Sequence, residues 1–135
     1  MGRRTFIISL LAAATLRGDG VRLRGKLTTT SDGTPALKTK RGLVRLEGDR
    51  ETAAVLGDKR LRDADFEVAG KFLANGRFRV NPIHTKAMWV YHDGKRHTIS
   101  YWCDVCSIRS YTPGICWCCQ QETKLDLRED KDEQK

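Results

Sequence analysis

Cysteines cluster near the C-terminal end of this chain and limit how that end can fold. Five cysteines lie within seventeen residues: Cys103, Cys106, Cys116, Cys118 and Cys119. They form two CxxC units, and the nine residues between the units include the turn-forming pair Pro113-Gly114. Each CxxC loop can turn two thiolates toward one point, so two loops can complete the tetrahedral shell of a Zn²⁺ ion. The spacing predicts a zinc-ribbon-like site in which the outer cysteines of each unit are ligands and Cys118 is a spare or exchange ligand.

Other chemistries can use the same cysteines. In an oxidising compartment cysteines form disulfides, and a bridge between the two CxxC units would close the turn around Pro113-Gly114. Five is an odd number, so this interpretation leaves one thiol unpaired or joined to another chain. An iron–sulfur cluster needs the same four thiolates. A thioredoxin-like redox pair is disfavoured because no βαβ pattern surrounds Cys103 and Cys106. The spacing favours zinc and leaves iron–sulfur and disulfides open.

The N-terminal segment has the composition of an export signal. Two arginines, Arg3 and Arg4, precede a nine-residue apolar run from Phe6 to Ala14, which ends in small residues. A run of this length is too short to span a bilayer, which takes ~20 apolar residues. We therefore interpret residues 1–18 as a secretory signal peptide. Its removal would leave a periplasmic or secreted protein with no transmembrane span in its mature form.

The arginine pair also resembles the core of a twin-arginine signal, and an ordinary Sec signal fits the segment equally well. The twin-arginine pathway exports proteins that are already folded. A protein exported in this way could load its metal in the reducing cytoplasm before it meets an oxidising compartment. The leader and the CxxC units together therefore support the hypothesis of an exported metal protein.

The net charge of +8 is concentrated in the first half of the chain. Residues 1–62 carry 14 Lys and Arg against 6 Asp and Glu, whereas residues 122–135 carry 4 against 6. A basic surface attracts anionic ligands, and it also keeps a protein soluble. We expect an anionic ligand or a protein partner, and no nucleic acid if the chain is exported. If residues 1–18 are not a signal, the alternative is a cytoplasmic nucleic-acid-binding module.

Residue patterns between the leader and the cysteines indicate a mainly β fold. At 135 residues, with 39% apolar residues, the chain has room for one compact domain. Alternation of apolar and polar residues predicts five short strands: Val21–Leu27, Ala36–Thr39, Leu43–Leu46, Phe66–Phe72 and Phe78–Val80. The second and third of these could also be one bent strand. Thr52 is expected to open a short helix that Gly57 closes.

The clearest local element is a β-hairpin over residues 86–102, with Asp93-Gly94 as a type I′ turn. In this register Tyr91 faces Arg96 and His92 faces Lys95. One face of the hairpin then carries an aromatic and basic set: Trp89, Tyr91, Arg96 and Trp102. In OB-like barrels such side chains stack on bases or sugars, whereas in a small protein they also fill the core. This set is the candidate ligand-binding face, and core packing is the alternative.

The order strand, strand, short helix, strand and hairpin resembles the small five-stranded OB-like barrels of exported bacterial proteins, so the 86–102 hairpin is expected to belong to the barrel. Three segments within residues 20–102 carry the resemblance: Leu46–Asp49, Val55–Asp58 and Phe66–Phe72. The segments Tyr101–Arg109 and Tyr111–Gly114 are similar to a group of uncharacterised exported bacterial proteins with a zinc-ribbon-like cysteine motif. An OB-like barrel is a scaffold for many functions, so the resemblance implies a fold and no activity.

These observations divide the chain into four parts: a signal peptide (1–18), an OB-like β domain (19–102), a cysteine-rich metal-binding appendage (103–127) and a disordered tail (128–135). No catalytic triad, phosphate-binding loop or carboxylate pair is readable, and His84, His92 and His97 are interpreted mostly as surface residues. We therefore expect an exported, non-enzymatic binding or structural module with a structural zinc site. The alternative is an iron–sulfur or thiol-based electron-transfer protein.

Overall fold

The structure, a computed structural model, describes residues 20–130, so the expected signal peptide and the last five residues lie outside the described part. Its elements are β1 (Val21–Thr29), β2 (Pro35–Thr39), β3 (Gly42–Glu47), α2 (Arg50–Leu56), η1 (Lys59–Leu61), β4 (Asp65–Phe72), β5 (Phe78–Val80), η2 (His84–Lys86), β6 (Met88–His92), β7 (Lys95–Cys103), β8 (Ile108–Ser110) and β9 (Lys124–Glu129). The fold is mainly β, as predicted. Among the described residues, no helix has the length and apolar character needed to cross a bilayer.

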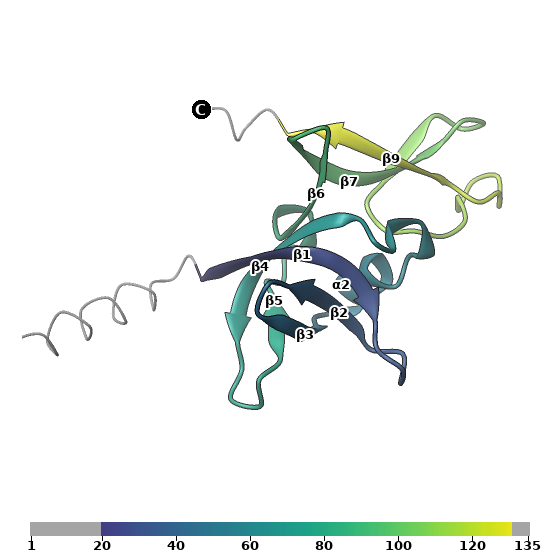
Figure 1. The fold of residues 1–135 in the computed structure, drawn as a ribbon. Coiled ribbons are helices and arrows are strands. Elements are labelled where there is room, and N and C mark those ends of the chain that lie inside the picture. Colours follow the sequence, from purple (N-terminus) through teal and green to yellow (C-terminus); the bar gives the residue numbers. More distant parts are fainter. Residues whose placement is uncertain (1–19, 131–135) are drawn as a thin grey trace, which may run out of the picture.

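The first five strands close into a small barrel (Figure 1). Their order is β1-β2-β3-β5-β4, and the pairing of β1 with β4 closes the ring. Neighbours are antiparallel except β3 and β5, which run parallel, and α2 lies between β3 and β4 in the chain. This is the OB-like barrel that the sequence predicts. The second and third predicted segments are two strands rather than one bent strand.

Two glycines allow barrel strands to approach one another closely. A Cβ on Gly70 would lie 2.0 Å from the carbonyl oxygen of Arg79, and a Cβ on Gly25 would lie 2.4 Å from that of Lys38. Gly25 lies where β1 leaves β2, because residues 26–29 pair with β2 whereas residues 21–26 pair with β4. A side chain at either position would collide with backbone, so the barrel requires glycine at both.

The short helix α2 begins at Arg50, earlier than the sequence indicated. Asp49, not Thr52, is the N-cap: its carboxylate accepts a hydrogen bond from the Thr52 backbone N–H at 3.0 Å. An Asp side chain at this position satisfies one of the N–H groups left free at a helix N-terminus. Thr52 is buried instead, inside the first turn. The helix ends at Gly57, as predicted.

The hairpin of β6 and β7 has the predicted register. Tyr91 pairs with Arg96, and His92 pairs with Lys95. Asp93 and Gly94 both have positive φ, 56° and 75°, as a type I′ turn requires. Both faces of β6 are covered, because Met88 and Trp89 are buried on opposite sides of the strand.

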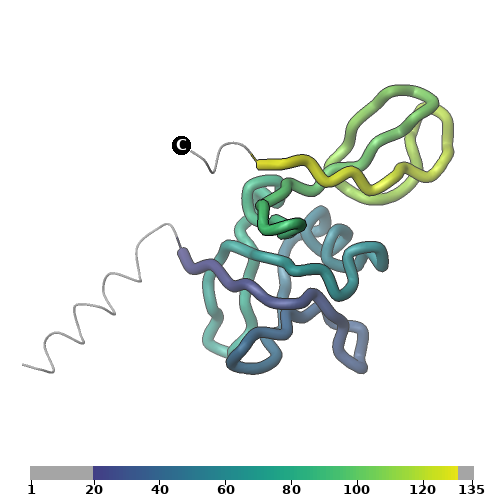
Figure 2. Tube along the Cα trace, turned by 45° about the horizontal axis from the view of Figure 1, so that its top comes forward, coloured from purple at the N-terminus to yellow at the C-terminus, as the bar shows by residue number. Residues whose placement is uncertain are grey.

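Beyond the barrel, the sheet continues through β4, β6 and β7 into a second lobe, shown in green to yellow in Figure 2. β6 pairs with residues 65–68 of β4, and β5 pairs with residues 70–72. The strands that close the barrel therefore end at Val80, earlier than the limit at residue 102 that the resemblance indicated. β8 and β9 both pair with β7. We call residues 95–130, from β7 to the end of the described chain, the cysteine lobe.

β9 continues beyond residue 127, the predicted end of the metal-binding appendage. It runs through Glu129, two residues into the range interpreted as a tail. The next residue, Asp130, forms an ion pair with the buried Arg96 at 2.9 Å, and its backbone N–H donates to the Arg96 carbonyl at 2.8 Å. A buried guanidinium needs an anionic partner, which accounts for the order of this segment.

One hydrophobic core joins the barrel to the cysteine lobe. Barrel side chains such as Phe66 and Phe78 belong to the same buried cluster as Tyr101 of β7. The Tyr101 hydroxyl donates a hydrogen bond to Asp58 Oδ2 at 2.9 Å, and the Arg60 guanidinium donates to the carbonyl oxygen of Thr123 at 2.9 Å. Burial, together with Asp58, raises the pKa of Tyr101, so its hydroxyl stays protonated. The cysteine lobe is therefore fixed to the barrel by apolar and polar contacts together.

Candidate metal centre

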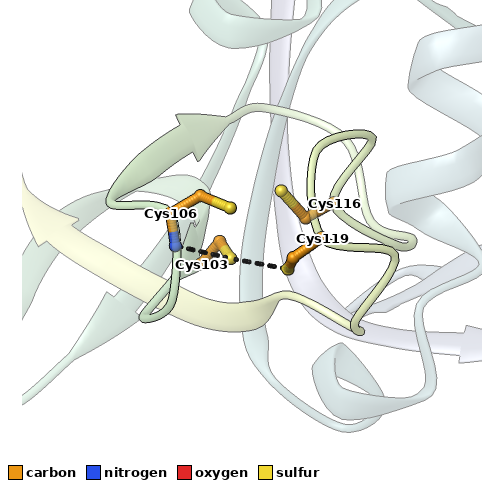
Figure 3. Close-up of side chains that lie close together, drawn as sticks. All are labelled: Cys103, Cys106, Cys116 and Cys119. Carbon is orange, nitrogen blue, oxygen red and sulfur yellow. Dashed lines mark hydrogen bonds between the residues drawn. The ribbon is translucent and has the colours of Figure 1, made fainter.

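The first CxxC unit forms a tight loop between β7 and β8. Cys103 is the last residue of β7, and Ile108 begins β8. The backbone N–H of Ser107 donates to the Cys103 carbonyl at 2.8 Å, and that of Cys106 donates to the Cys103 sulfur at 3.4 Å. Ser107 has a positive φ of 55°, which turns the chain back into β8. The loop thus directs both of its thiols to one side (Figure 3).

The second CxxC unit repeats this backbone pattern. The backbone N–H of Gln120 donates to the Cys116 carbonyl at 2.7 Å, and Gln120 has a positive φ of 67°. Gln120 therefore corresponds to Ser107 in the first loop. The base of the second loop is closed by Thr123, whose hydroxyl and backbone N–H both donate to the Gly114 carbonyl, at 2.9 and 3.0 Å. Two loops of the same local geometry thus face each other.

The two loops bring together the sulfurs of four cysteines: Cys103, Cys106, Cys116 and Cys119. All four sulfurs lie within 4.8 Å of one another, and those of Cys103 and Cys119 are 3.5 Å apart. All five cysteines of the cluster are free thiols. A tetrahedral shell with Zn–S near ~2.3 Å has sulfur–sulfur edges of about 3.8 Å. The four sulfurs therefore fit a tetrathiolate metal site after small movements.

The thiols of the cluster differ in their acidity. Backbone N–H groups of Cys119 and Cys118 point at the Cys116 sulfur and lower the pKa of Cys116 to about 7. Hydrogen bonding with the Cys118 thiol, together with burial, raises the pKa of Cys106. Four thiolates at this separation would repel one another strongly. The cluster can hold all four in the thiolate form only if a cation is bound between them.

Cys118, the fifth thiol, lies beside Cys106 but outside the group of four. Its side chain is exposed, whereas Cys103 and Cys116 are buried. In this arrangement the four CxxC cysteines point inward, and Cys118 remains accessible to solvent.

Contacts around the cluster tie both loops to the rest of the lobe. Asp104 of the first loop forms an ion pair with Lys124, the first residue of β9. Arg109 of β8 donates to Asp126 of β9 at 2.7 Å, and the same nitrogen donates to Ser100 at 2.7 Å. These ion pairs could not be predicted from the sequence, because each joins segments that only the pairing of β9 with β7 brings together.

The aromatic and basic set predicted as a binding face lies mostly under other side chains. Trp89 is only 5% exposed, and the guanidinium groups of Arg22 and Arg96 lie 5.1 and 4.5 Å from its ring centroid. Tyr91 is covered by Arg24 at 3.5 Å from its ring. Trp102 lies further along β7 and contacts Arg109 instead. The structure thus brings Trp89 and Arg96 together and separates Trp102 from them. Ligand binding by this set stays a prediction.

The three histidines lie outside the sulfur cluster. His92 and His97 lie near the turn of the β6–β7 hairpin, with ring centroids 5.9 Å apart, at the opposite end of β7 from Cys103. His84 hydrogen-bonds through Nε2 to the carbonyl oxygen of Tyr111 at 2.9 Å, which links η2 to the loop after β8. Within residues 20–130, the group suited to a metal ion consists of cysteines alone.

The fold and the site together define an OB-like barrel that carries a four-cysteine cluster able to hold a metal ion. Comparison of the chain with models of known protein families, with curated proteins and with solved structures finds no match. Function must therefore be argued from the site itself.

Proposed function

We propose that this protein is an exported, non-enzymatic binding or structural module whose C-terminal lobe is held in shape by a structural Zn²⁺ ion. The observation that carries the proposal is the pair of CxxC loops with matching backbone geometry, which directs four sulfurs to one point. Cys103, Cys106, Cys116 and Cys119 would be the ligands. A tetrathiolate zinc site has no open coordination position, so the ion would stabilise the fold and would not bind substrate.

The packing of the cysteine loops supports a structural role for the metal. In the stretch from 103 to 123, the buried residues are Cys103, Cys116 and Thr123. Of the large apolar side chains of this stretch, Ile108 is half-buried and the others are exposed: Val105, Tyr111, Ile115 and Trp117. Twenty-one residues with so little buried apolar surface cannot offset their conformational entropy by packing alone. A bound metal supplies that missing free energy in small domains of this kind.

The state of the cysteines is consistent with the export proposal. In an oxidising compartment the four clustered thiols would be expected to form disulfides unless a metal holds them as thiolates, whereas the exposed Cys118 would stay the odd, unpaired thiol. Loading of zinc in the cytoplasm, followed by export of the folded protein through the twin-arginine pathway, would satisfy both requirements. Residues 1–18, including Arg3 and Arg4, would direct that export.

Elemental analysis of protein purified from the periplasm tests the metal site. We expect one zinc per chain in the wild type and in Cys118→Ser, which is the matched control because its side chain is outside the group of four. Cys103→Ser should lose the zinc, and trypsin should then cut at Arg109, which is tied to Asp126 in the intact lobe. If the variant fails to fold, a chelator added to the wild type should produce the same cut. Zinc-free protein with intact disulfides would contradict the proposal. A brown protein that contains iron would show that the four cysteines bind iron instead of zinc.

A fusion of residues 1–20 to an export reporter tests the localisation. The wild-type leader should carry the reporter to the periplasm, and Arg3→Lys combined with Arg4→Lys should block this if the twin-arginine pathway is used. Export that persists in the double variant would indicate the Sec pathway. A reporter retained in the cytoplasm would contradict export and would favour a nucleic-acid-binding module.

A further inference from the structure

A groove of about 970 Å³ lies on the barrel, away from the cysteines. It is lined by the first half of β1, by the turn between β2 and β3, and by Val44, Asp63, Asp65 and Phe72. None of its lining residues belongs to the cysteine lobe. The groove is therefore a second feature, independent of the candidate metal centre.

One wall of the groove is an open strand edge. Residues 21–26 of β1 pair with β4 on one edge, and on the other edge β2 pairs only with residues 26–29. In the described part of the chain, no strand pairs with the second edge of residues 21–25. At ~3.4 Å per residue this edge is about 17 Å long. Unpaired backbone groups on a strand edge are a template for pairing with another extended chain.

The floor of the groove is apolar and mostly aliphatic. Val21 and Leu23 are alternate residues of β1, so they share a face of the strand, and both are half-buried. Val44 of β3 is half-buried as well, and Phe72 is 50% exposed at the end of β4. A single exposed ring offers little surface for stacking a series of nucleobases, which ssDNA-binding grooves do with several aromatic side chains. Aliphatic side chains of an extended peptide would fit this floor better.

The rim of the groove is strongly basic. Six of its lining residues are Lys or Arg, and two are Asp. Asp65 is neutralised by Arg24, with 2.8 Å between the guanidinium and the carboxylate. The remaining basic side chains include Lys26, Lys38, Lys40 and Arg41, and none of these four forms an ion pair with a residue in the 20–130 range. Charge complementarity therefore requires an acidic ligand.

We propose that this groove binds an extended, acidic peptide segment of a partner protein, which adds to the open edge of β1 as a further strand. Backbone hydrogen bonds to residues 21–25 would supply affinity, as in other cases of β-strand addition. Alternate apolar side chains of the peptide would pack on Val21 and Leu23, and its acidic side chains would meet Lys38, Lys40 and Arg41. This proposal names the class of ligand for the binding module proposed above. It rests on the protein being a binding module, and it does not depend on a bound metal.

Selection of a random peptide library on the full chain tests this proposal. We expect the enriched sequences to alternate acidic and apolar residues, and a labelled enriched peptide to bind more weakly as salt is raised. The triple variant Lys38→Glu, Lys40→Glu, Arg41→Glu should weaken this binding by about tenfold or more. The matched control is Lys59→Glu, Arg62→Glu, Lys86→Glu, which changes the net charge equally with exposed side chains outside the groove. It should bind nearly as well as the wild type.

Amide hydrogen exchange locates the peptide. Bound peptide should slow exchange in residues 21–25, and protection confined to other segments would overturn the proposal. It would also be overturned if no acidic sequences are enriched, if the triple variant binds equally well, or if a dT oligonucleotide or oleate displaces the peptide from the groove. Zinc content measured on the same variants separates the two proposals, because the groove variants should keep their metal whether or not they bind the peptide.

Discussion

Replacement of Tyr101 by Phe tests how the cysteine lobe is attached to the barrel. Tyr101 is fully buried, and its hydroxyl donates to Asp58 at 2.9 Å. A hydrogen bond to a charged group contributes about 1.5–3 kcal/mol. Asp58 keeps the bonds that it accepts from Arg60, from both the backbone N–H and the guanidinium. The Asp58 carboxylate is therefore not left unpaired in the variant. Tyr101→Phe should lower the free energy of unfolding by an amount toward the lower end of that range, about 2 kcal/mol.

For a chain of this size, 1 kcal/mol corresponds to about 4 °C in Tm, so Tyr101→Phe should lower Tm by roughly 8 °C. The assay is thermal unfolding followed by circular dichroism at pH 7, with zinc content measured on the same sample. Zinc should be unchanged, because the hydroxyl lies outside the sulfur cluster. An unchanged Tm would refute the conclusion that this bond joins the two lobes.

The effect of Tyr101→Phe should also depend on pH. Burial alone would raise the pKa of Asp58, but hydrogen bonds from Arg60 and Tyr101 outweigh it, and the pKa is lowered. A carboxyl group with a lowered pKa stabilises the fold above its unfolded-state pKa, and this contribution is lost as pH falls through the folded-state value. The difference in stability between wild type and variant should therefore be largest at neutral pH and shrink below about pH 4. A difference that grows in acid would contradict this account.

Three further predictions concern other parts of the molecule. Gly25→Ala should destabilise the protein by about 2–3 kcal/mol, measured by urea unfolding, because the new Cβ would meet the Lys38 carbonyl oxygen at 2.4 Å; a change below about 0.5 kcal/mol would show that the strands can separate freely. With zinc bound, a thiol reagent should modify Cys118 rapidly and the other four cysteines only after chelation; fast reaction of all five would argue against a bound metal. Zinc should be released as pH falls, because protons compete with the metal for the thiolates. If the zinc retained after dialysis does not change with pH, that result would be inconsistent with sulfur ligands.

Local sequence patterns predicted the parts of the fold that depend on neighbouring residues. The Asp93-Gly94 turn fixes the hairpin register, because only residues that tolerate positive φ suit a type I′ turn. The CxxC spacing likewise determines a loop within four residues, so it predicted which cysteines gather. In both cases the local geometry follows from a few adjacent residues, whereas the meeting of the two CxxC loops depends on the pairing of β8 and β9 with β7.

The features that sequence missed depend on contacts between distant segments. Nothing near Val80 signals that the barrel closes there, because closure depends on the parallel pairing of β3 with β5 and on β1 reaching β4. The start of α2 at Arg50 was missed because Thr52, a residue type that also caps helices, lies three positions after the N-cap Asp49. The basic groove could not be predicted either, because its rim combines residues from β1 with residues from the β2–β3 turn, which only the fold brings together.

X-ray absorption spectroscopy at the zinc edge identifies the atoms that bind the metal and their distances. On wild-type protein isolated without added metal, we expect a single shell of four sulfur atoms near ~2.3 Å. In Cys103→Ser this shell should be lost or should contain nitrogen or oxygen beside sulfur. A wild-type shell dominated by nitrogen or oxygen, or metal-free protein in which the cysteines are joined by S–S bonds, would contradict the proposed zinc site.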